Sequence, residues 1–435
     1  MQEFRPALKR GPAVAAPEKA NPFDVTVSVT ARPAATGEPE VRVGRLLALL
    51  LPTALSLYAN FNGVQSIVTP QLIEAIDPAN KIERLAELTT VCAVTGVLGL
   101  SLGGAFSDAT HGRYGRRAPW LAGMALLSAG LSLGLTGQTT LIGVNAVCGA
   151  LWFTLNFFQA AMLAATPDRV PDKKRALASS VVGISGPLGA VFGVNVAAYL
   201  PNGLGVVALV ICLLLSTTLF LVFAREKPFA PRPRPAGGRR RSLNLFRSFG
   251  FRDFSLAYVF RVLMFLGQFS INNYLFYILQ DHIGSANPGV ASGQISALRT
   301  TATLATVGLA LWFANRTEKR KIFAQSYALI MAAAMLIPVA FPSWSGMLAF
   351  AALSGIASGV YSAIDLPLMS KVLPSQDSAG RDLALLVMAG ASAQFLAPWI
   401  GGGLIAHFGY EALFIVSAFI TLLCGLTISM IRRAP

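Results

Sequence analysis

The sequence predicts an all-α membrane protein of twelve transmembrane helices, arranged as two pseudo-symmetric bundles of six. The first observation is composition, since 54% of the 435 residues are hydrophobic and only 13% are charged. The second is that apolar runs of about 20 residues, enough helix to cross a ~30 Å hydrocarbon core, follow one another with short breaks. The third is that sequence features of the first half recur in the second.

The expected spans follow directly from these apolar runs. They cover approximately residues 46–70, 85–107, 118–137, 139–165, 176–198, 204–224, 254–280, 293–314, 322–340, 345–370, 382–406 and 410–431. The chain then divides into a polar cytoplasmic tail without fixed structure (1–45), a first six-helix bundle (46–224), a Pro- and Arg-rich cytoplasmic linker (225–252), a second six-helix bundle (253–431) and a cytoplasmic C-terminus (432–435).

Basic residues predict the orientation. Of the 35 Lys and Arg, all but four lie in the tail, in the loops on one side or at the C-terminus. Lys81 and Arg84 are in an opposite loop, and Arg261 and Arg299 are inside spans. The positive-inside rule therefore predicts a multi-pass protein of the cell (inner) membrane with both termini cytoplasmic. The net charge of +15 is scattered over short loops, which argues against nucleic acid as a partner.

Two pairs of loops support an internal repeat. Asp108 after the second span corresponds to Asn315 after the eighth, 207 positions later, and Arg175 corresponds to Arg381, 206 positions later. Two independent pairs separated by almost the same number of residues indicate two structurally equivalent halves.

The loop after the second span carries a recognisable motif. Gly104-x-x-x-Asp108 ends the span, and Gly115-Arg116-Arg117 opens the next. This arrangement resembles the signature loop of the major facilitator superfamily, and the longer form with Arg113 is similar to the glycoside-pentoside-hexuronide cation symporters and sucrose transporters. Many of those have an Arg where this chain has Ala109, so part of their charge relay is missing.

The resemblance implies that loop charges latch the halves on the cytoplasmic side. Asp108 at a helix C-terminus needs a cation, and Arg116 or Arg175 is within reach. The alternative for the other loop arginines is a role in topology and lipid contact alone. The expected gating residues are Asp108, Arg113, Gly115, Arg116, Arg117, Asp168, Arg175, Arg316, Arg320 and Arg381.

The resemblance also implies that the first, fourth, seventh and tenth spans line a central cavity. Their amides and aromatics suit a sugar, whose hydroxyls pair with amides and whose ring faces stack on aromatics. The alternative is that these amides join neighbouring helices. The candidate binding residues are Asn60, Asn62, Gln65, Trp152, Asn156, Gln159, Gln268, Asn272, Asn273, Tyr277 and Tyr361.

Ionisable residues inside spans are costly and need a reason. At 1.5 Å per residue, Arg261 lies ~12 Å and Asp365 ~9 Å from the cytoplasmic ends of their spans, whereas Arg299 lies in the outer third of the eighth. Arg261 and Asp365 are therefore the expected pair. We hypothesise that Asp365 carries the coupling proton; the equal alternative is that Asp365 only anchors the end of its helix.

These residues predict a secondary active transporter for a sugar or glycoside, working by alternating access as a proton symporter and as a monomer. The alternative is proton-coupled efflux of an amphipathic drug or metabolite. The sequence has no nucleophile and base pair, phosphate-binding loop or metal cluster, so we expect neither enzymatic activity nor a cofactor or metal. The expected partners are a small polar solute, a proton and the lipid bilayer.

Overall fold

We describe the protein from a computed structural model. It describes residues 43–110, 115–170, 174–200, 203–224, 245–314, 316, 320–373 and 379–431, all within one compact unit, Val41–Pro435. Within these ranges the regular structure is helical, and eleven helices are long and apolar enough to span a membrane.

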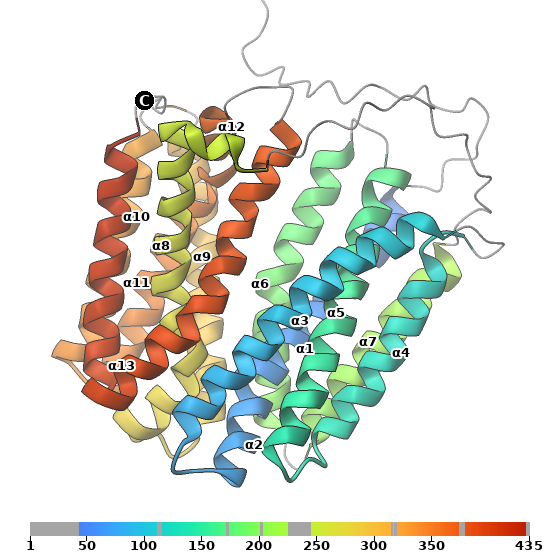
Figure 1. The fold of residues 1–435 in the computed structure, drawn as a ribbon, viewed down its shortest axis with the longest axis horizontal. Helices are drawn as coiled ribbons and strands as arrows, with labels where there is room; N and C mark the ends of the chain where they lie inside the picture. Colours follow the sequence, from blue (N-terminus) through green and yellow to red (C-terminus); the bar gives the residue numbers. More distant parts are fainter. Residues whose placement is uncertain are drawn as a thin grey trace, which may run out of the picture. The chain divides into compact units, whose positions relative to one another are not determined.

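The first half contains six spans, in agreement with the sequence (Figure 1). The first span is longer than predicted, because α1, a short π-helix and α2 form one rod from Val43 to Ile76. The elements are α1 (Val43–Gly63), η1 (Val64–Val68), α2 (Thr69–Ile76), α3 (Lys81–Ala109), α4 (Ala118–Leu135), α5 (Leu141–Arg169), α6 (Arg175–Tyr199) and α7 (Leu204–Phe223).

The second half repeats this arrangement. Its elements are η3 (Leu245–Gly250), α8 (Arg252–Tyr277), η4 (Ile278–His282), α9 (Pro288–Ala314), α10 (Arg320–Ala340), α11 (Trp344–Ser362), α12 (Asp365–Val372) and α13 (Ala379–Ser429). The eighth span begins at Pro288 rather than at 293, because proline is well suited to the first turn of a helix.

Two spans of the second half are interrupted. The tenth span is divided into α11 and α12 by a turn at Ala363 and Ile364. The continuous α13 contains Gly409 at φ +82°, a left-handed conformation that favours glycine. This break separates α13 into the two last spans, close to the predicted 382–406 and 410–431, and brings the spans among the described residues to twelve.

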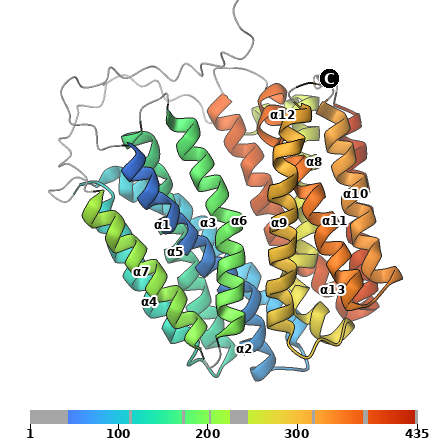
Figure 2. The same ribbon diagram turned by 180° about the vertical axis from the view of Figure 1, so that it is seen from behind.

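The two halves lie side by side, α1–α7 in blue to green and α8–α13 in yellow to red (Figures 1 and 2). They meet where α3 packs against α13 and where α6 packs against α9. Large apolar side chains such as Ile142, Leu126 and Phe408 are 84%, 64% and 74% exposed. Such a surface suits hydrocarbon, so the helices shield polar side chains between them and present apolar ones to lipid.

Candidate functional site

A stripe of three polar residues runs along α8. Arg261, Gln268 and Asn272 recur at intervals of seven and four residues, which places them on one face of the helix, as the sequence predicts. Gln268 Nε2 lies 3.5 Å from the Ser358 hydroxyl of α11, and Asn272 Oδ1 accepts a 2.7 Å hydrogen bond from Arg299 of α9. The stripe therefore faces the neighbouring helices of its own half.

The predicted ion pair is present at the first position of this stripe. Arg261 Nη1 lies 2.8 Å from Asp365 Oδ1, and the two side chains are 8% and 26% exposed. The same carboxylate oxygen accepts a hydrogen bond from the Tyr361 hydroxyl. Arg261 also contacts Met369 Sδ and lies over the ring of Phe265, 5.4 Å from its centroid. The pair is thus held between α8 and α12 by polar and apolar contacts together.

The first half brings together an uncharged group of predicted residues. Gln159 Nε2 of α5 donates a 3.2 Å hydrogen bond to the Tyr58 hydroxyl of α1. Further along the same pair of helices, Trp152 meets Phe61 edge to face, with ring centroids 5.7 Å apart. Asn156 between them donates to the Trp152 carbonyl and lies close to Gly96, where a Cβ atom would come within 2.9 Å of its Nδ2. An amide, a phenol and two rings therefore line one face.

Two other candidates lie elsewhere. Asn60 is fully buried between α1 and α7, where its amide donates to the Ser56 and Leu209 carbonyls. Asn62 is half-buried and donates to the Tyr58 carbonyl of its own helix. Asn60 therefore joins two helices, which was the alternative role considered for these amides. We do not include it in the site proposed below.

The remaining candidates join the two halves. Gln65 Nε2 of η1 lies 3.4 Å from Asn273 Oδ1 of α8. The Tyr277 hydroxyl donates a 2.9 Å hydrogen bond to the Pro70 carbonyl of α2. These two contacts join the first half to α8 of the second half, on the side toward α2.

A charged network continues from there to the end of the molecule where α2 lies (Figure 1), which we call the closed end. Lys81 Nζ lies 3.0 Å from Glu74 Oε1 in its own half and 2.9 Å from Asp281 Oδ1 in the other. Gln280 donates to Glu74, and the Tyr410 hydroxyl donates to Asp281 at 2.6 Å. Lys81 is the hub of this network and ties the halves together.

Among the described residues five hydrogen bonds join the two halves, and all five lie at or near the closed end. The fifth runs from Asn195 Nδ2 of α6 to the Gly293 carbonyl of α9. The sequence analysis placed Lys81 in the opposite loop but gave it no role, although a lysine in a loop otherwise poor in basic residues was a usable signal. Next to the network, a hydrogen bond from Arg84 lowers the pKa of Asp77.

The predicted gating residues lie at the opposite end. Arg116 Nη2 is 2.5 Å and Arg117 Nη2 is 3.6 Å from Asp108 Oδ1, which gives Asp108 the cation that it needs within its own half. Gly115 turns this loop at φ +91°. Arg316 lies over the ring of Trp312, 3.7 Å from its centroid. Arg113 and the side chains of Asp168, Arg175, Arg320 and Arg381 lie outside the described residues.

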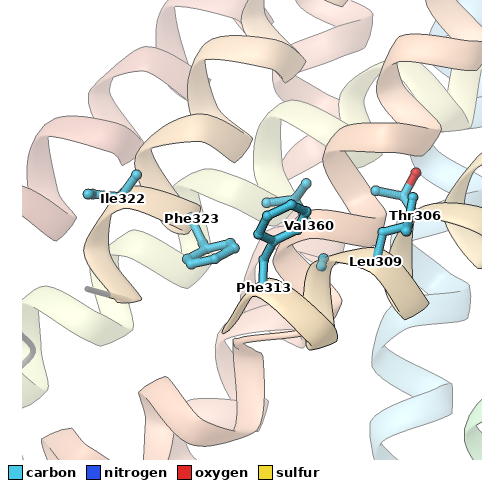
Figure 3. A pocket seen from close by; sticks show the side chains of 7 residues that line it. Thr306, Leu309, Phe313, Ile322, Phe323 and Val360 are labelled. Atoms are coloured by element: carbon cyan, nitrogen blue, oxygen red, sulfur yellow. The ribbon is translucent and has the colours of Figure 1, made fainter. Parts of the chain in front are cut away.

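A groove of about 450 Å³ opens between α9, α10 and α11 (Figure 3). Its lining is apolar except for one hydroxyl, on Thr306, which is bonded to the Ala302 carbonyl. A site for a polar solute needs several converging polar groups. The groove therefore does not compete with the α8 stripe as the solute site.

The sequence matches the family model of the Major Facilitator Superfamily over residues 50–342 and again over 261–435. This chain belongs to the major facilitator superfamily. It is a multi-pass membrane transporter and not an enzyme. No curated protein matches it.

Solved transporter structures share the fold of this superfamily member. A peptide transporter POT in complex with sulfate has a TM-score of 0.70 at 13% identity, covering 89% of this chain and 94% of that one. The nucleoside transporter NupG gives 0.68 at 14%, covering 89% and 98%. A bacterial homologue of the lysosomal transporter Spinster, inward-facing and occupied, gives 0.66 at 13%, covering 92% and 98%. At such identities the likeness concerns the fold alone.

Proposed function

We propose that this carrier moves a sugar or glycoside across the cell (inner) membrane by alternating access, in symport with a proton. The observation that carries the proposal is the ion pair between the buried Arg261, which belongs to the same α8 stripe as Gln268, and the partly exposed Asp365 of α12. Placing a charge pair inside a membrane span costs free energy, so its presence indicates a function. Proton coupling is such a function.

Protonation of Asp365 removes the charge that holds Arg261 and leaves the Tyr361 hydroxyl without its ionised acceptor. Since α12 begins at Asp365, loss of the pair also loosens the junction between α11 and α12. Protonation can thereby be linked to movement of the tenth span. The competing role for Asp365 is to anchor the first turn of α12, where the helix dipole favours an acid.

Sugar recognition is assigned to the uncharged face. Gln159 and Asn156 offer both donors and acceptors to hydroxyl groups, and the half-buried ring of Phe61, packed against the buried Trp152, offers an apolar surface to a pyranose ring. A phenol such as Tyr58 can donate or accept. The chemistry that a neutral sugar ring requires is therefore available on α1 and α5.

We further propose that both termini are cytoplasmic, which makes the closed end extracellular and this conformation inward-facing. Lys81, Glu74 and Asp281 then form the outer gate, and the Asp108 loop forms the cytoplasmic one. The outer gate must break before solute can enter from outside.

A second candidate function is proton-coupled efflux of an amphipathic compound. The stacked rings of Phe265 and Phe269 on α8, with centroids 5.5 Å apart, favour it. Drug sensitivity of cells that overexpress the protein, compared with their uptake of labelled disaccharides, separates the two functions.

The direct test is proton flux in reconstituted vesicles. Addition of a glycoside to vesicles carrying an internal pH dye is expected to acidify the lumen, and a protein-free control is not. Solute movement without proton movement would contradict symport. Proton movement caused only by lipophilic cations would favour efflux.

A further inference from the structure

The apolar groove between α9, α10 and α11 lies at the end of the second half opposite the closed end (Figure 3). Its α9 residues run from Thr306 to Phe313, ~10 Å along the helix axis, and Phe313 is the last residue but one of α9. Ile322, across the mouth, is in the first turn of α10. Leu309, Phe313 and Ile322 are exposed. The groove is therefore an open apolar trough that ends at the level of the lipid headgroups.

The equivalent place in the first half is filled by side chains of the protein itself. With the offset of 207 residues, Ala310 corresponds to Gly103 of α3. Gly103 packs so closely on α5 that a Cβ atom there would lie 2.7 Å from the Phe157 carbonyl oxygen. The Trp120 ring packs on the Phe157 ring, with centroids 4.9 Å apart. In the second half Ala310 lines the groove instead, so the groove is a departure from the repeat.

The charges beside the groove depart from the repeat as well. In the first half Asp108 lies 2.5 Å from Arg116 and balances its charge. In the second half the residue corresponding to Asp108 is Asn315, and the following segment, 316–321, has four basic residues and one acid, a net charge of +3. This segment joins the two helices that form the mouth of the groove. An excess of positive charge is thus tethered where the trough ends.

Two described side chains of this segment can reach a ligand at the mouth. Arg316 is exposed and lies over the Trp312 ring, 3.7 Å from its centroid, and the half-buried Lys321 directly precedes Ile322. A guanidinium that rests on an aromatic ring keeps its N–H groups free to donate at its edge, where a phosphate accepts two of them at once. The mouth therefore suits a phosphate group.

An anionic phospholipid matches both departures with one molecule. Its acyl chain fills the trough, whose lining would otherwise lack dispersion contacts on one side. Its phosphate meets the basic segment, and basic pockets between membrane helices on the cytoplasmic side bind anionic headgroups in this way. A zwitterionic lipid brings its own cation and gains less from the excess positive charge.

We propose that this groove is a binding site for one anionic phospholipid of the cytoplasmic leaflet, with an acyl chain along α9 and its phosphate at Arg316 and Lys321. The lipid supplies to the second half what Trp120 and Asp108 supply to the first, an apolar filling and a negative charge. The site is separate from the solute site, and its occupancy does not depend on which solute is carried.

The full-length protein in vesicles tests the proposal through Trp312, whose fluorescence is quenched by bromine atoms on a nearby acyl chain. The Trp312 signal is the difference between each protein and its own Trp312→Phe version. Dibrominated phosphatidylglycerol should bind about 10-fold more tightly at this position than dibrominated phosphatidylcholine, since two basic side chains attract the anionic headgroup. Equal binding of the two lipids would show that any acyl chain fills the groove and would overturn the proposal. Weak quenching by both, together with a dimer in light scattering, would assign the groove to a second copy of the chain and overturn it too.

Arg316→Gln should reduce the preference for phosphatidylglycerol about 5-fold. Arg45→Gln is the matched control, because Arg45 is also exposed and lies over a ring, Phe223 at 5.2 Å, at the start of α1. Equal reductions in both variants would assign the preference to general surface charge and contradict the proposal. Ala310→Leu fills part of the trough and should weaken binding with Arg316 intact; unchanged binding would overturn the place given to the acyl chain. Should a variant fail to fold, the comparison of the two lipids on the unaltered protein still decides.

Discussion

The two halves of the molecule have matching helices but different chemistry at matching positions. With the offset of 206 residues, Gln159 of α5 corresponds to Asp365 of α12. Gln159 bonds a neutral phenol, Tyr58, whereas Asp365 pairs with Arg261. The repeat therefore determines at which positions polar side chains lie. The residue at each position determines whether that site is neutral, as at Gln159, or charged, as at Asp365.

The largest effect on this asymmetry is expected from Arg261→Met. It leaves the Asp365 carboxylate without its cation, and breaking a buried pair costs about 3 kcal/mol, toward the lower end of the usual range because Asp365 is 26% exposed. Unfolding of the protein in detergent measures this loss. The double variant Arg261→Met with Asp365→Asn should recover part of the stability. A double variant no more stable than the single one would show that the pair is not the cause.

Changes on the uncharged face of α1 and α5 should alter the affinity for sugar but not the coupling of transport to protons. Tyr58→Phe or Gln159→Leu removes one hydrogen bond, worth about 1 kcal/mol, and should weaken sugar binding roughly 5-fold. The number of protons moved per solute should stay unchanged in vesicles. If either variant uncouples transport, the division of labour between the halves is wrong.

At the closed end, an ion pair between the halves can be compared with ion pairs inside one half. Lys81→Gln removes one ion pair between the halves and one within the first, and we expect a shift of about 1 kcal/mol toward opening, roughly 5-fold in population. Spin labels at the exposed Ala79 and Asn287 report the separation of the halves there. Arg84→Gln is the control, since its partners Asp77 and Glu87 belong to its own half; equal shifts in both variants would exclude a gate role for Lys81.

The smallest effect concerns Asp77. Because the hydrogen bond from Arg84 lowers its pKa, the pair stabilises the fold above the unfolded pKa of about 3.9, and this contribution disappears as pH falls through the lower folded value. Melting curves of the unaltered protein and Asp77→Asn should differ slightly at neutral pH, begin to converge as pH falls below about 4, and coincide once pH is below the lowered folded pKa. A difference that persists in acid would assign it to another cause.

The fold could be predicted because it depends on properties that are local in sequence. The length of each apolar run locates a span. The rise per residue gives each ionisable residue a depth, and by depth Asp365 is matched to Arg261 and not to Arg299. The start of α9 was misplaced since Asn287-Pro288-Gly289 is typical of a loop, although proline also opens helices. That error placed Arg299 nearer the outer end of its helix than the structure does.

The closed end could not be predicted in the same way. Glu74 and Asp281 lie near helix ends, where charges are ordinary and carry no signal by themselves, so the position of Lys81 alone could not identify its partners. Their contact depends on how the halves tilt, which differs between the conformations of one carrier. Likewise, Asn60 and Gln65 are both amides of the first span, and only packing shows that one joins α7 while the other reaches the second half.

Proton coupling at Asp365 is tested most directly by measuring proton-driven accumulation of solute by Asp365→Asn, with Gln159→Leu as the matched change in the other half. In vesicles with an imposed pH gradient, Asp365→Asn should abolish accumulation, by at least 100-fold, but still exchange internal for external solute, and Gln159→Leu should accumulate with reduced affinity only. Unaltered accumulation by Asp365→Asn would contradict the account and leave this residue as an anchor for α12.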